Sequence, residues 1–508
     1  MALKKRSKIS LSHYKLLSMK MGYIVPIGLT EVLPGDTFQV STSSFIRVSP
    51  LVSPVMHPVH VKIHHWYVPF RLIWDDFEDF ITGGEDGLNT SVVPYMTLTN
   101  AVSIGSLADY LGVPTDQAGL KLCALPFRAY NLIYNEWYRD QDLEDEIAIS
   151  TESGEDKTTA TQLMQNSWAR DYFTTARPWP QKGPAVSVPV NLTAAGEPTI
   201  SATTTIAGDG APIFSVQSAA VANRLRSASR GTSGESVLTD SGNMGGLAWS
   251  NPALTATTNI NYTSGNPELG SVDINQLREA FALQRFEEHR ALYGSRYTEY
   301  LRYLGIRASD ARLQRPEYLG GGKQTIQFSE VLQTAEGTDP VGTLRGHGIA
   351  AMRTNRFRRF FEENGYLLTF MTVQPIAVYM QGLPRLWQRE VKEDFFQKEL
   401  QHIGQQEVYK SELYATAANT TTKTIFGYQN RYDEYRYHES SVSGEFRTML
   451  NYWHMARDFD AEPELNASFL NGLPTNRIYA STDTDQLYVM ANHSIQARRL
   501  MAKLGNPI

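Results

Sequence analysis

The stretch Phe38-Gln-Val-Ser-Thr-Ser-Ser-Phe-Ile-Arg-Val48 decides the fold class of this chain. Its even positions read Phe, Val, Thr, Ser, Ile and Val, and its odd positions read Gln, Ser, Ser, Phe and Arg. An alternation with a period of two residues is typical of a β-strand that buries one face. We therefore predict a strand over Phe38–Val48 and a mainly β protein.

Neighbouring segments extend this pattern. A second strand is predicted over Val59–Pro69, because Val59, Val61, Ile63 and Tyr67 fall on one face. Later strands are predicted over Tyr366–Met380, Val442–Tyr452 and Ile478–Met490. Helices are predicted over Trp74–Phe80, Phe127–Trp137, Ile274–Tyr293 and Arg296–Tyr303. Strands and helices do not alternate regularly along the chain, which disfavours a doubly wound sheet.

The composition is that of a soluble, packed protein. Of the 508 residues, 42% are hydrophobic and 20% are charged, which excludes a largely disordered chain. The single cysteine, Cys123, excludes an intrachain disulfide framework and a cysteine-based zinc site. The longest uncharged run, residues 364–384, contains Gln374, Pro375 and Gly382. We therefore predict a strand and a turn there, and no membrane insertion.

Positive charge is concentrated at the two ends of the chain. Residues 1–30 hold six cations and no acid, and residues 486–508 hold three cations and no acid, although the net charge is -6. Basic ends on an acidic body suggest that both ends face a polyanion, with solvated tails as the alternative. We predict a basic N-terminal arm over residues 1–30. The candidate nucleic-acid contacts are Lys4, Lys5, Arg6, Lys8, Lys15, Lys20, Arg498, Arg499 and Lys503.

No local motif predicts catalysis or a bound cofactor. His57, His60, His64 and His65 cluster, but Lys62 shares a strand face with His60 and His64 and opposes a divalent metal. The acidic run from Asp140 to Glu146 lacks the ligand spacing of an EF-hand, so a solvated loop is favoured over a calcium site. We predict no metal, no cofactor and no catalytic residue. A β-rich metal-dependent or carbohydrate-active enzyme that uses these groups is the alternative.

A further cluster combines arginine with phenylalanine. Its members are Arg345, Arg353, Arg356, Arg358 and Arg359, with Phe357, Phe360 and Phe361 among them. Guanidinium groups next to aromatic rings suit single-stranded nucleic acid, through phosphate pairing and base stacking. Equally, the phenylalanines can be core residues while the arginines form salt bridges between subunits. Both interpretations stay open, and a monomeric nucleic-acid-binding module is a further alternative for the whole chain.

Residues 191–270 differ in composition from the rest of the chain. These eighty residues hold eight charged side chains and are otherwise rich in Thr, Ser, Ala and Gly. Such a segment cannot build a large core of its own. We predict either a long surface insertion with a few short strands or partial disorder. The net charge of the segment is -2, which disfavours contact with phosphate.

Seven aromatic-rich stretches carry a resemblance to a known family. They are His65–Trp74, Ala124–Trp137, Asp171–Gly183, Tyr297–Tyr300, Asp310–Gly321, Gln381–Trp387 and Gly427–Tyr437. In this order they resemble the major capsid protein of microviruses, the small icosahedral phages with circular single-stranded DNA. The gokushovirus branch is the most similar. Residues 191–270 match nothing that can be placed residue by residue, and Arg498–Pro507 follows the family's closing segment only loosely.

The resemblance implies a structural protein and no enzyme. The implied fold is an eight-stranded antiparallel jelly roll with large loop insertions containing helices, in a single domain over residues 31–508. The implied assembly is a closed icosahedral T=1 shell of sixty copies, with five-fold and three-fold contacts, around a single-stranded DNA genome. Residues 191–270 would then form an outward trimeric protrusion used in host attachment.

The resemblance also implies partners and a location. The partners are further copies of the chain, the DNA genome, a small basic DNA-binding virion protein, a minor pilot protein and a host surface receptor. The location is the virion, after assembly in the host bacterial cytoplasm. Because Tyr, Trp and Arg concentrate at interfaces, we expect subunit contacts in the aromatic blocks. The expected contact residues are Tyr428, Arg431, Tyr432, Tyr435, Arg436, Tyr437 and Trp137.

Overall fold

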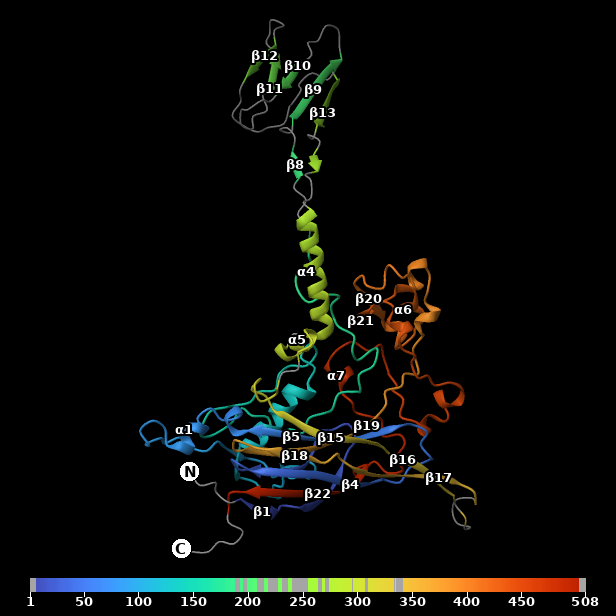
Figure 1. Cartoon of the computed structure of the whole chain (residues 1–508). Coiled ribbons are helices and arrows are strands. Elements are labelled where there is room, and N and C mark those ends of the chain that lie inside the picture. The colour runs from blue at the N-terminus through green and yellow to red at the C-terminus, as the bar shows by residue number, and fades with distance from the viewer. Residues whose placement is uncertain are drawn as a thin grey trace. The chain divides into compact units, whose positions relative to one another are not determined.

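The structure is a computed structural model of the chain, and it divides into two compact units (Figure 1). Unit 1 comprises Met1–Gly183 and Phe286–Ile508, and unit 2 comprises Pro184–Arg285. The described residues are 6–187, 192–194, 199–207, 214–217, 227–230, 236–239, 255–263, 267–269, 274–294, 296–306, 309–332, 334 and 341–501. The protein is mainly β, with antiparallel sheets and a few short helices in unit 1.

The first sheet of unit 1 has seven strands. Its main path runs β1-β22-β4-β17-β16, while β2 pairs with β22 and β18 pairs with β4. The bounds are β1 (Ser7–Ser10), β2 (His13–Met19), β4 (Thr37–Val48), β16 (Gln327–Leu332), β17 (Leu344–Arg353), β18 (Phe357–Phe360) and β22 (Leu487–Arg499). The strand predicted over Phe38–Val48 is confirmed as β4. Residues 7–19 of the predicted basic arm form β1 and β2, both paired with β22.

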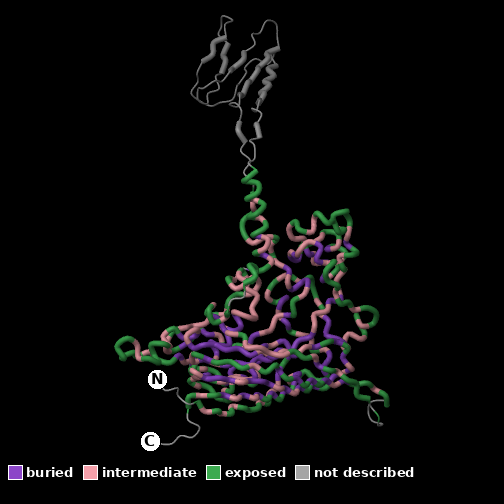
Figure 2. The backbone as a smooth tube through the Cα atoms, in the orientation of Figure 1, coloured by how far each residue is buried: buried purple, intermediate pink, exposed green. Residues whose placement is uncertain are grey.

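The second sheet of unit 1 has the strand order β15-β5-β19-β3. The bounds are β3 (Val25–Val32), β5 (Val59–Pro69), β15 (Glu317–Thr325) and β19 (Gly365–Pro375). The strand predicted over Val59–Pro69 is confirmed as β5. Ile46 and Val489 of the first sheet share one buried cluster with Ile63 and Met371 of the second. Figure 2 shows that buried residues are concentrated along the strands of the two layers. The two sheets therefore form a sandwich with the main core between them.

The remaining elements of unit 1 lie mostly in the long connections between these strands. Two further strand pairs are β6 (Tyr95–Leu98) with β7 (Leu120–Cys123) and β20 (Gln405–Tyr409) with β21 (Ile425–Asn430). The α-helices are α1 (Phe77–Thr82), α2 (Leu107–Leu111), α3 (Leu125–Ile133), α4 (Ile274–Tyr293), α5 (Tyr297–Tyr303), α6 (Ala417–Thr422) and α7 (Ala467–Leu470). Helix α4 begins in unit 2. Among the described residues, none of the helices has the length and apolar character needed to cross a bilayer.

Short helical turns complete the connections. A π-helical turn, η2 (Tyr134–Tyr138), continues α3. The 3-10 turns are η1 (Phe70–Leu72), η3 (Arg385–Trp387), η4 (Lys392–Asp394), η5 (Lys410–Glu412), η6 (Asp433–Tyr435), η7 (Gly444–Arg447) and η8 (Asn451–Trp453). The predicted helix over Phe127–Trp137 is thus confirmed as α3 with η2. The helix predicted over Trp74–Phe80 lies slightly later, as α1, which ends at Gly83 with a φ of 89°.

Three strand predictions in the last third need correction. No strand forms over Val442–Tyr452, where Gly444 has a φ of 67° and the Glu445 carbonyl accepts local bonds from Thr448 and Leu450. These turns replace extended structure because they satisfy the backbone locally. The strand predicted over Ile478–Met490 begins only at Leu487, since the Ser481–Asp485 stretch forms bends. The strand predicted over Tyr366–Met380 ends at Pro375, which lacks an N–H group for the ladder.

Unit 2 contains strands within the segment singled out by its composition. One three-stranded sheet has the order β10-β9-β13, and two further pairs are β11 with β12 and β14 with β8. The bounds are β8 (Leu192–Ala194), β9 (Thr199–Ala207), β10 (Phe214–Gln217), β11 (Ser227–Arg230), β12 (Ser236–Thr239), β13 (Thr255–Thr263) and β14 (Pro267–Leu269). The other residues between 191 and 270 lie outside the described part of the chain.

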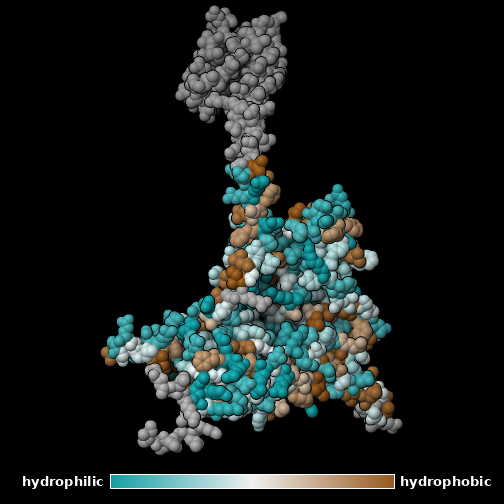
Figure 3. Space-filling view, viewed as in Figure 1, coloured by the Kyte–Doolittle hydropathy of each residue, from teal (hydrophilic) through white to brown (hydrophobic). Residues whose placement is uncertain are grey.

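Large apolar side chains are exposed on unit 1. Figure 3 shows them as separate brown areas between hydrophilic residues on the visible face. Two groups of these exposed side chains are relevant to function, because the members of each group come from the same part of unit 1. One group lies in residues 386–403 and 435–437, and the other lies on β2 and β22 of the first sheet.

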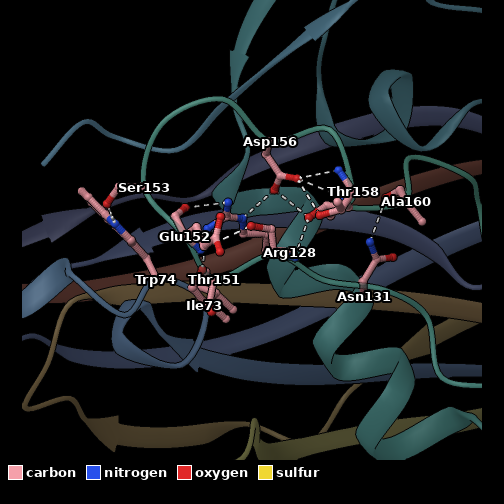
Figure 4. Close-up of polar contacts among 12 residues, drawn as sticks. Ile73, Trp74, Arg128, Asn131, Thr151, Glu152, Ser153, Asp156, Thr158 and Ala160 are labelled. Carbon is pink, nitrogen blue, oxygen red and sulfur yellow. Dashed lines mark hydrogen bonds and ion pairs between the residues drawn. The ribbon is translucent and has the colours of Figure 1, made fainter.

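A buried ion pair fixes the connection that follows α3. The guanidinium of Arg128 donates to Asp156 at 2.8 Å, and both side chains are fully buried (Figure 4). Arg128 also donates to the carbonyls of Ile73 and Glu152. Burial alone would raise the pKa of Asp156, but hydrogen bonds from Thr159 and Arg128 lower it below its ordinary value. The network therefore joins α3, the end of η1 and the 152–159 loop.

Replacing Asp156 with alanine should strongly destabilise unit 1. The substitution leaves the buried guanidinium of Arg128 without its carboxylate, which costs about 3–5 kcal/mol of unfolding free energy. The matched control is Lys157→Ala, which removes the exposed Lys157–Glu155 pair and should cost about 0–1 kcal/mol. Urea unfolding measures both variants. Similar small losses in the two proteins would contradict the role given to the network.

Candidate functional surfaces

The predicted nucleic-acid contacts occupy different environments. Lys4, Lys5 and Lys503 lie outside the described residues. Lys15 is turned inward: its ammonium donates to the carbonyls of Pro26 and Tyr110. Burial lowers the pKa of Lys15 to about 8, although Asp109 opposes this shift. Lys15 is therefore bound within the subunit rather than presented to a ligand.

Arg499 is also engaged within the chain. Its guanidinium donates to the buried carboxylate of Asp36 at 3.0 Å and to the carbonyl of Glu31 at 2.6 Å. Arg6 donates to Gly35 and Thr37 and lies 5.6 Å from the ring centroid of Phe360. Both arginines consequently help to hold the end of the first sheet.

The remaining candidates are presented to solvent. Lys8 and Arg498 are exposed and stand directly opposite each other on β1 and β22. Lys20 is exposed at the end of β2. Lys8 and Arg498 therefore place two cations side by side at one end of the first sheet.

The arginine–phenylalanine cluster divides between the core and the surface, and its two predicted roles stay predictions. Phe361 is buried against Phe38 and Tyr67, and Phe357 packs on His65 with ring centroids 5.3 Å apart. Arg359 forms an ion pair with Glu317 of the same chain at 3.0 Å. Arg353 and Arg358, in contrast, are exposed. Arg358 is opposite Gln39, and Arg353 is opposite Ser43 on β4. These two arginines point away from the core on the same face of the first sheet.

The histidine cluster divides between the two faces of β5: His65 lies between the sheets, and His60 and His64 lie on the face opposite to Val59, Val61 and Ile63. Among the described residues, no group of three or more His, Cys, Asp or Glu side chains has a geometry suited to a metal ion. His65 contacts Thr369 at 3.0 Å and Thr354 at 3.3 Å, and His493 contacts Thr42 at 2.9 Å. Thr354 in turn accepts from the backbone of Thr42. This chain of contacts connects the two sheets through buried polar groups.

Burial lowers the pKa of these histidines. It lowers the pKa of His65 to about 3 and that of His493 to about 4, with smaller contributions from neighbouring positive charges. His64 contacts the hydroxyl of Tyr138 at 2.7 Å, and burial lowers its pKa to about 4. His57 and His60 contact the Ile376 carbonyl and the Thr325 hydroxyl. Each of the four clustered histidines therefore has a hydrogen-bond partner within unit 1.

The acidic run is held by cations of the same chain. Arg177 lies 3.2 Å from Asp140 and 3.1 Å from Asp142, and Lys182 also contacts Asp142. Burial raises the pKa of Glu144, which accepts from the hydroxyl of Tyr134. The prediction of a freely solvated loop is therefore wrong for Asp140 and Asp142, because ion pairs fix both carboxylates.

The predicted subunit contacts also divide by exposure. Trp137 packs against Trp66 with ring centroids 4.9 Å apart, and Arg315 lies 4.3 Å from its ring centroid. Tyr432 is buried, Tyr428 and Arg431 are half-buried, and Arg436 pairs with Asp433 at 2.9 Å. Tyr435 and Tyr437 remain 48% and 60% exposed. Only these last two present a large aromatic surface to a partner.

Tyr435 and Tyr437 belong to a set of exposed residues within 386–403 and 435–437 that we call the aromatic patch, in which contacts join Arg389, Phe395, Phe396 and Tyr435. Its members are Leu386, Trp387, Val391, Phe395, Phe396, Ile403, Tyr435 and Tyr437. Trp387 is 73% exposed, and Arg389 lies 5.2 Å from the ring centroid of Phe395 and 4.7 Å from that of Tyr435. Exposed Trp, Tyr, Phe and Arg in one region are typical of a protein–protein contact.

Two sets of exposed residues were missed by the sequence predictions. Phe395 and Phe396 form an apolar pair within the charged stretch Lys392–Glu399, which is the signal that could have indicated an exposed contact. Arg47 was assigned only to the polar face of its strand. Whether Arg47 lies near other cations depends on which strands are next to β4. The alternation of residues within one strand does not determine the order of the strands.

Comparison with known proteins places the chain in a family. The family model described as capsid protein (F protein) matches residues 2–508. The chain is 36% identical to capsid protein VP1 of Bdellovibrio phage phiMH2K, covering 94% of this chain and 90% of that protein. It is 31% identical to capsid protein VP1 of Chlamydia phage 1, covering 94% and 91%, and 30% identical to that of Spiroplasma virus 4, covering 99% and 95%. The role is structural rather than enzymatic. The chain belongs to the phage capsid protein (F protein) family and is a major capsid protein of the microvirus type.

Proposed function

We propose that this capsid protein assembles into a closed icosahedral T=1 shell of sixty copies around a single-stranded DNA genome. The observation that carries the proposal is the family match over residues 2–508. Self-assembly is what a capsid protein does, and the exposed aromatic patch supplies a surface suited to it. The virion is the location, and the host bacterial cytoplasm is the proposed place of assembly.

We further propose that the sandwich of unit 1 is an eight-stranded jelly roll that begins at β2, so β2 and β3 of the predicted arm belong to the jelly roll and only β1 precedes it. The order of the strands along the chain supports this fold. Successive strands β2, β3, β4 and β5 alternate between the first and second sheets, while β15, β17, β19 and β22 occupy the remaining places. The two four-stranded layers are then β2-β22-β4-β17 and β3-β19-β5-β15. Strands from opposite ends of the chain are neighbours in both layers, as in a jelly roll.

The aromatic patch is the proposed main contact with a second copy of the chain. Burying an exposed Trp or Tyr at the centre of an interface commonly contributes 2 kcal/mol or more, on the order of a thirtyfold change in affinity. Arg389 already stacks on Phe395 and Tyr435, so the patch is partly ordered before association. Tyr435 and Tyr437 retain their predicted role as contacts, and Trp387 and Phe395 join them.

Truncating the patch should impair assembly while leaving the subunit folded. We expect Trp387→Ser with Phe395→Ser to raise the protein concentration needed for shell formation by at least about thirtyfold. The side chains are 73% and 52% exposed, so the fold should tolerate the change. Ile104→Ser with Met449→Ser, at residues 79% and 76% exposed outside the patch, is the control. Sedimentation and negative-stain microscopy give the result, and unchanged assembly of the patch variant would refute the assignment.

Unit 2 is proposed to form the outward, trimeric protrusion used in host attachment. The net charge of -2 over residues 191–270 supports an outward position, because an inner surface would meet phosphate. The few apolar residues of this segment give a single copy little core, which favours packing against further copies. Outside the shell, the proposed partner is a host surface receptor. Inside the shell, the proposed partners are a small basic DNA-binding protein and a minor pilot protein.

Deleting residues 195–266 should separate assembly from infection. The cut joins Ala194 to Pro267, which are opposite each other on β8 and β14. We expect closed shells in normal yield, because the sandwich and the aromatic patch are unchanged. Adsorption to host cells should fall at least tenfold in a cell-binding assay. Particles that bind cells like the unaltered virus would exclude unit 2 as the attachment element.

A further inference from the structure

One face of the first sheet packs on the core, and its other face is exposed to solvent. The solvent-exposed face has an unusual composition. The pairing registers place Arg47 opposite Tyr488 and Ile349, and Tyr14 opposite Asn492. Arg47, Tyr488 and Ile349 are the sequence neighbours of the buried Ile46, Val489 and Ala350, so they lie on the opposite face of the sheet. Directly opposite residues in a ladder share a face, so the registers define the whole solvent side of the sheet.

This solvent side, which we call the basic face, gathers cations from five strands. Its charged members are Lys8, Arg47, Arg345, Arg353, Arg358 and Arg498, contributed by β1, β4, β17, β18 and β22. Among the described strand residues that the registers place on this side, none is Asp or Glu. Asp485, at its margin, is engaged by the hydroxyl of Ser18. On a chain with a net charge of -6, this segregation produces a local positive potential.

The basic face also exposes aromatic rings beside its cations. Tyr14 is 71% exposed, Tyr488 is 43% exposed and Phe360 is 49% exposed. The guanidinium of Arg47 lies 5.5 Å from the ring centroid of Phe45, and that of Arg6 lies 5.6 Å from the ring centroid of Phe360. Flat rings on a positively charged surface accept unpaired bases, whereas the paired bases of a duplex are already stacked. The ring positions therefore favour a single strand over a duplex.

We propose that the basic face binds single-stranded DNA, with the arginines on phosphates and Tyr14, Tyr488 and Phe360 stacking on bases. The proposal rests on the proposed enclosure of a genome and identifies the surface that would meet it. It adds Arg47, Arg353 and Arg358 to the terminal cations Lys8 and Arg498, and it leaves out Lys15 and Arg499, which are engaged inside the subunit. A protein partner could cover the exposed Leu16 and Met490, but the absence of described acids on the face favours a polyanion.

Binding of a fluorescent (dT)20 strand to the full-length unassembled protein tests the phosphate contacts. Arg47→Gln, Arg353→Gln and Arg358→Gln together should lower the slope of log affinity against log salt by about two, since each phosphate contact in a single strand contributes about 0.7. Lys157→Gln, Lys392→Gln and Lys398→Gln remove the same charge from exposed positions elsewhere and should leave the slope unchanged. An equal effect of both triple variants would overturn the proposal, because net charge alone would then explain binding.

Aromatic variants test base stacking separately. Tyr14→Ala and Tyr488→Ala should each weaken (dT)20 binding by between about fivefold and a hundredfold. Binding of an abasic strand of equal length should not change in these variants. Equal affinity of the unaltered protein for (dT)20, the abasic strand and a 20-base-pair duplex would overturn the stacking assignment. The DNA content of assembled particles is a separate measurement: empty shells would contradict genome enclosure, whereas the solution assay decides whether the face binds.

Discussion

The pairing of β22 with β4 is the contact on which the rest of unit 1 depends. It joins residues 487–498 to residues 37–48, so the last strand of the chain lies in the middle of the first sheet. β22 also pairs with β1 and β2, and β4 also pairs with β17 and β18. Without this ladder the first sheet would separate into two parts. A shift of β22 by one residue relative to β4 would turn Arg498 into the core and Ala497 out to solvent.

Buried polar contacts hold the layers and connections that this ladder positions. His65 and His493 meet between the sheets through Thr42 and Thr354, and Arg128 with Asp156 anchors the connection after α3. Such groups are costly to bury unless every partner is present, so they favour one arrangement of the surrounding loops. A capsid subunit needs this precision, because each loop geometry is repeated in every copy of the shell.

The local patterns predicted the early strands well because alternation is a property of neighbouring residues. β4 and β5 follow from the spacing of Val, Ile and Phe, and α3 follows from its aromatic spacing. The stretch 442–452 was misjudged because a left-handed Gly444 and bonds to the Glu445 carbonyl compete with extended structure. The sites were harder to predict. Lys15 and Arg499 are cations in a basic segment, yet their partners Tyr110 and Asp36 are distant in sequence.

The basic face could not be predicted from local sequence patterns either. Lys8, Arg47, Arg353, Arg358 and Arg498 are scattered along the sequence, and only the strand order brings them onto one surface. The whole chain has a negative net charge, which concealed a local surface whose described strand residues include no acid. The aromatic patch is similar, because residues 386–396 and 435–437 come from separate connections that meet through contacts such as Arg389 with Tyr435.

Electron cryo-microscopy of particles formed by the full-length chain tests the central claim most directly. We expect closed icosahedral shells of sixty copies, with the aromatic patch at a contact between subunits and the basic face turned to the interior beside nucleic-acid density. A protein that remains monomeric under all assembly conditions would contradict the claim. Closed shells with the basic face on the outer surface would contradict the proposed orientation of the subunit.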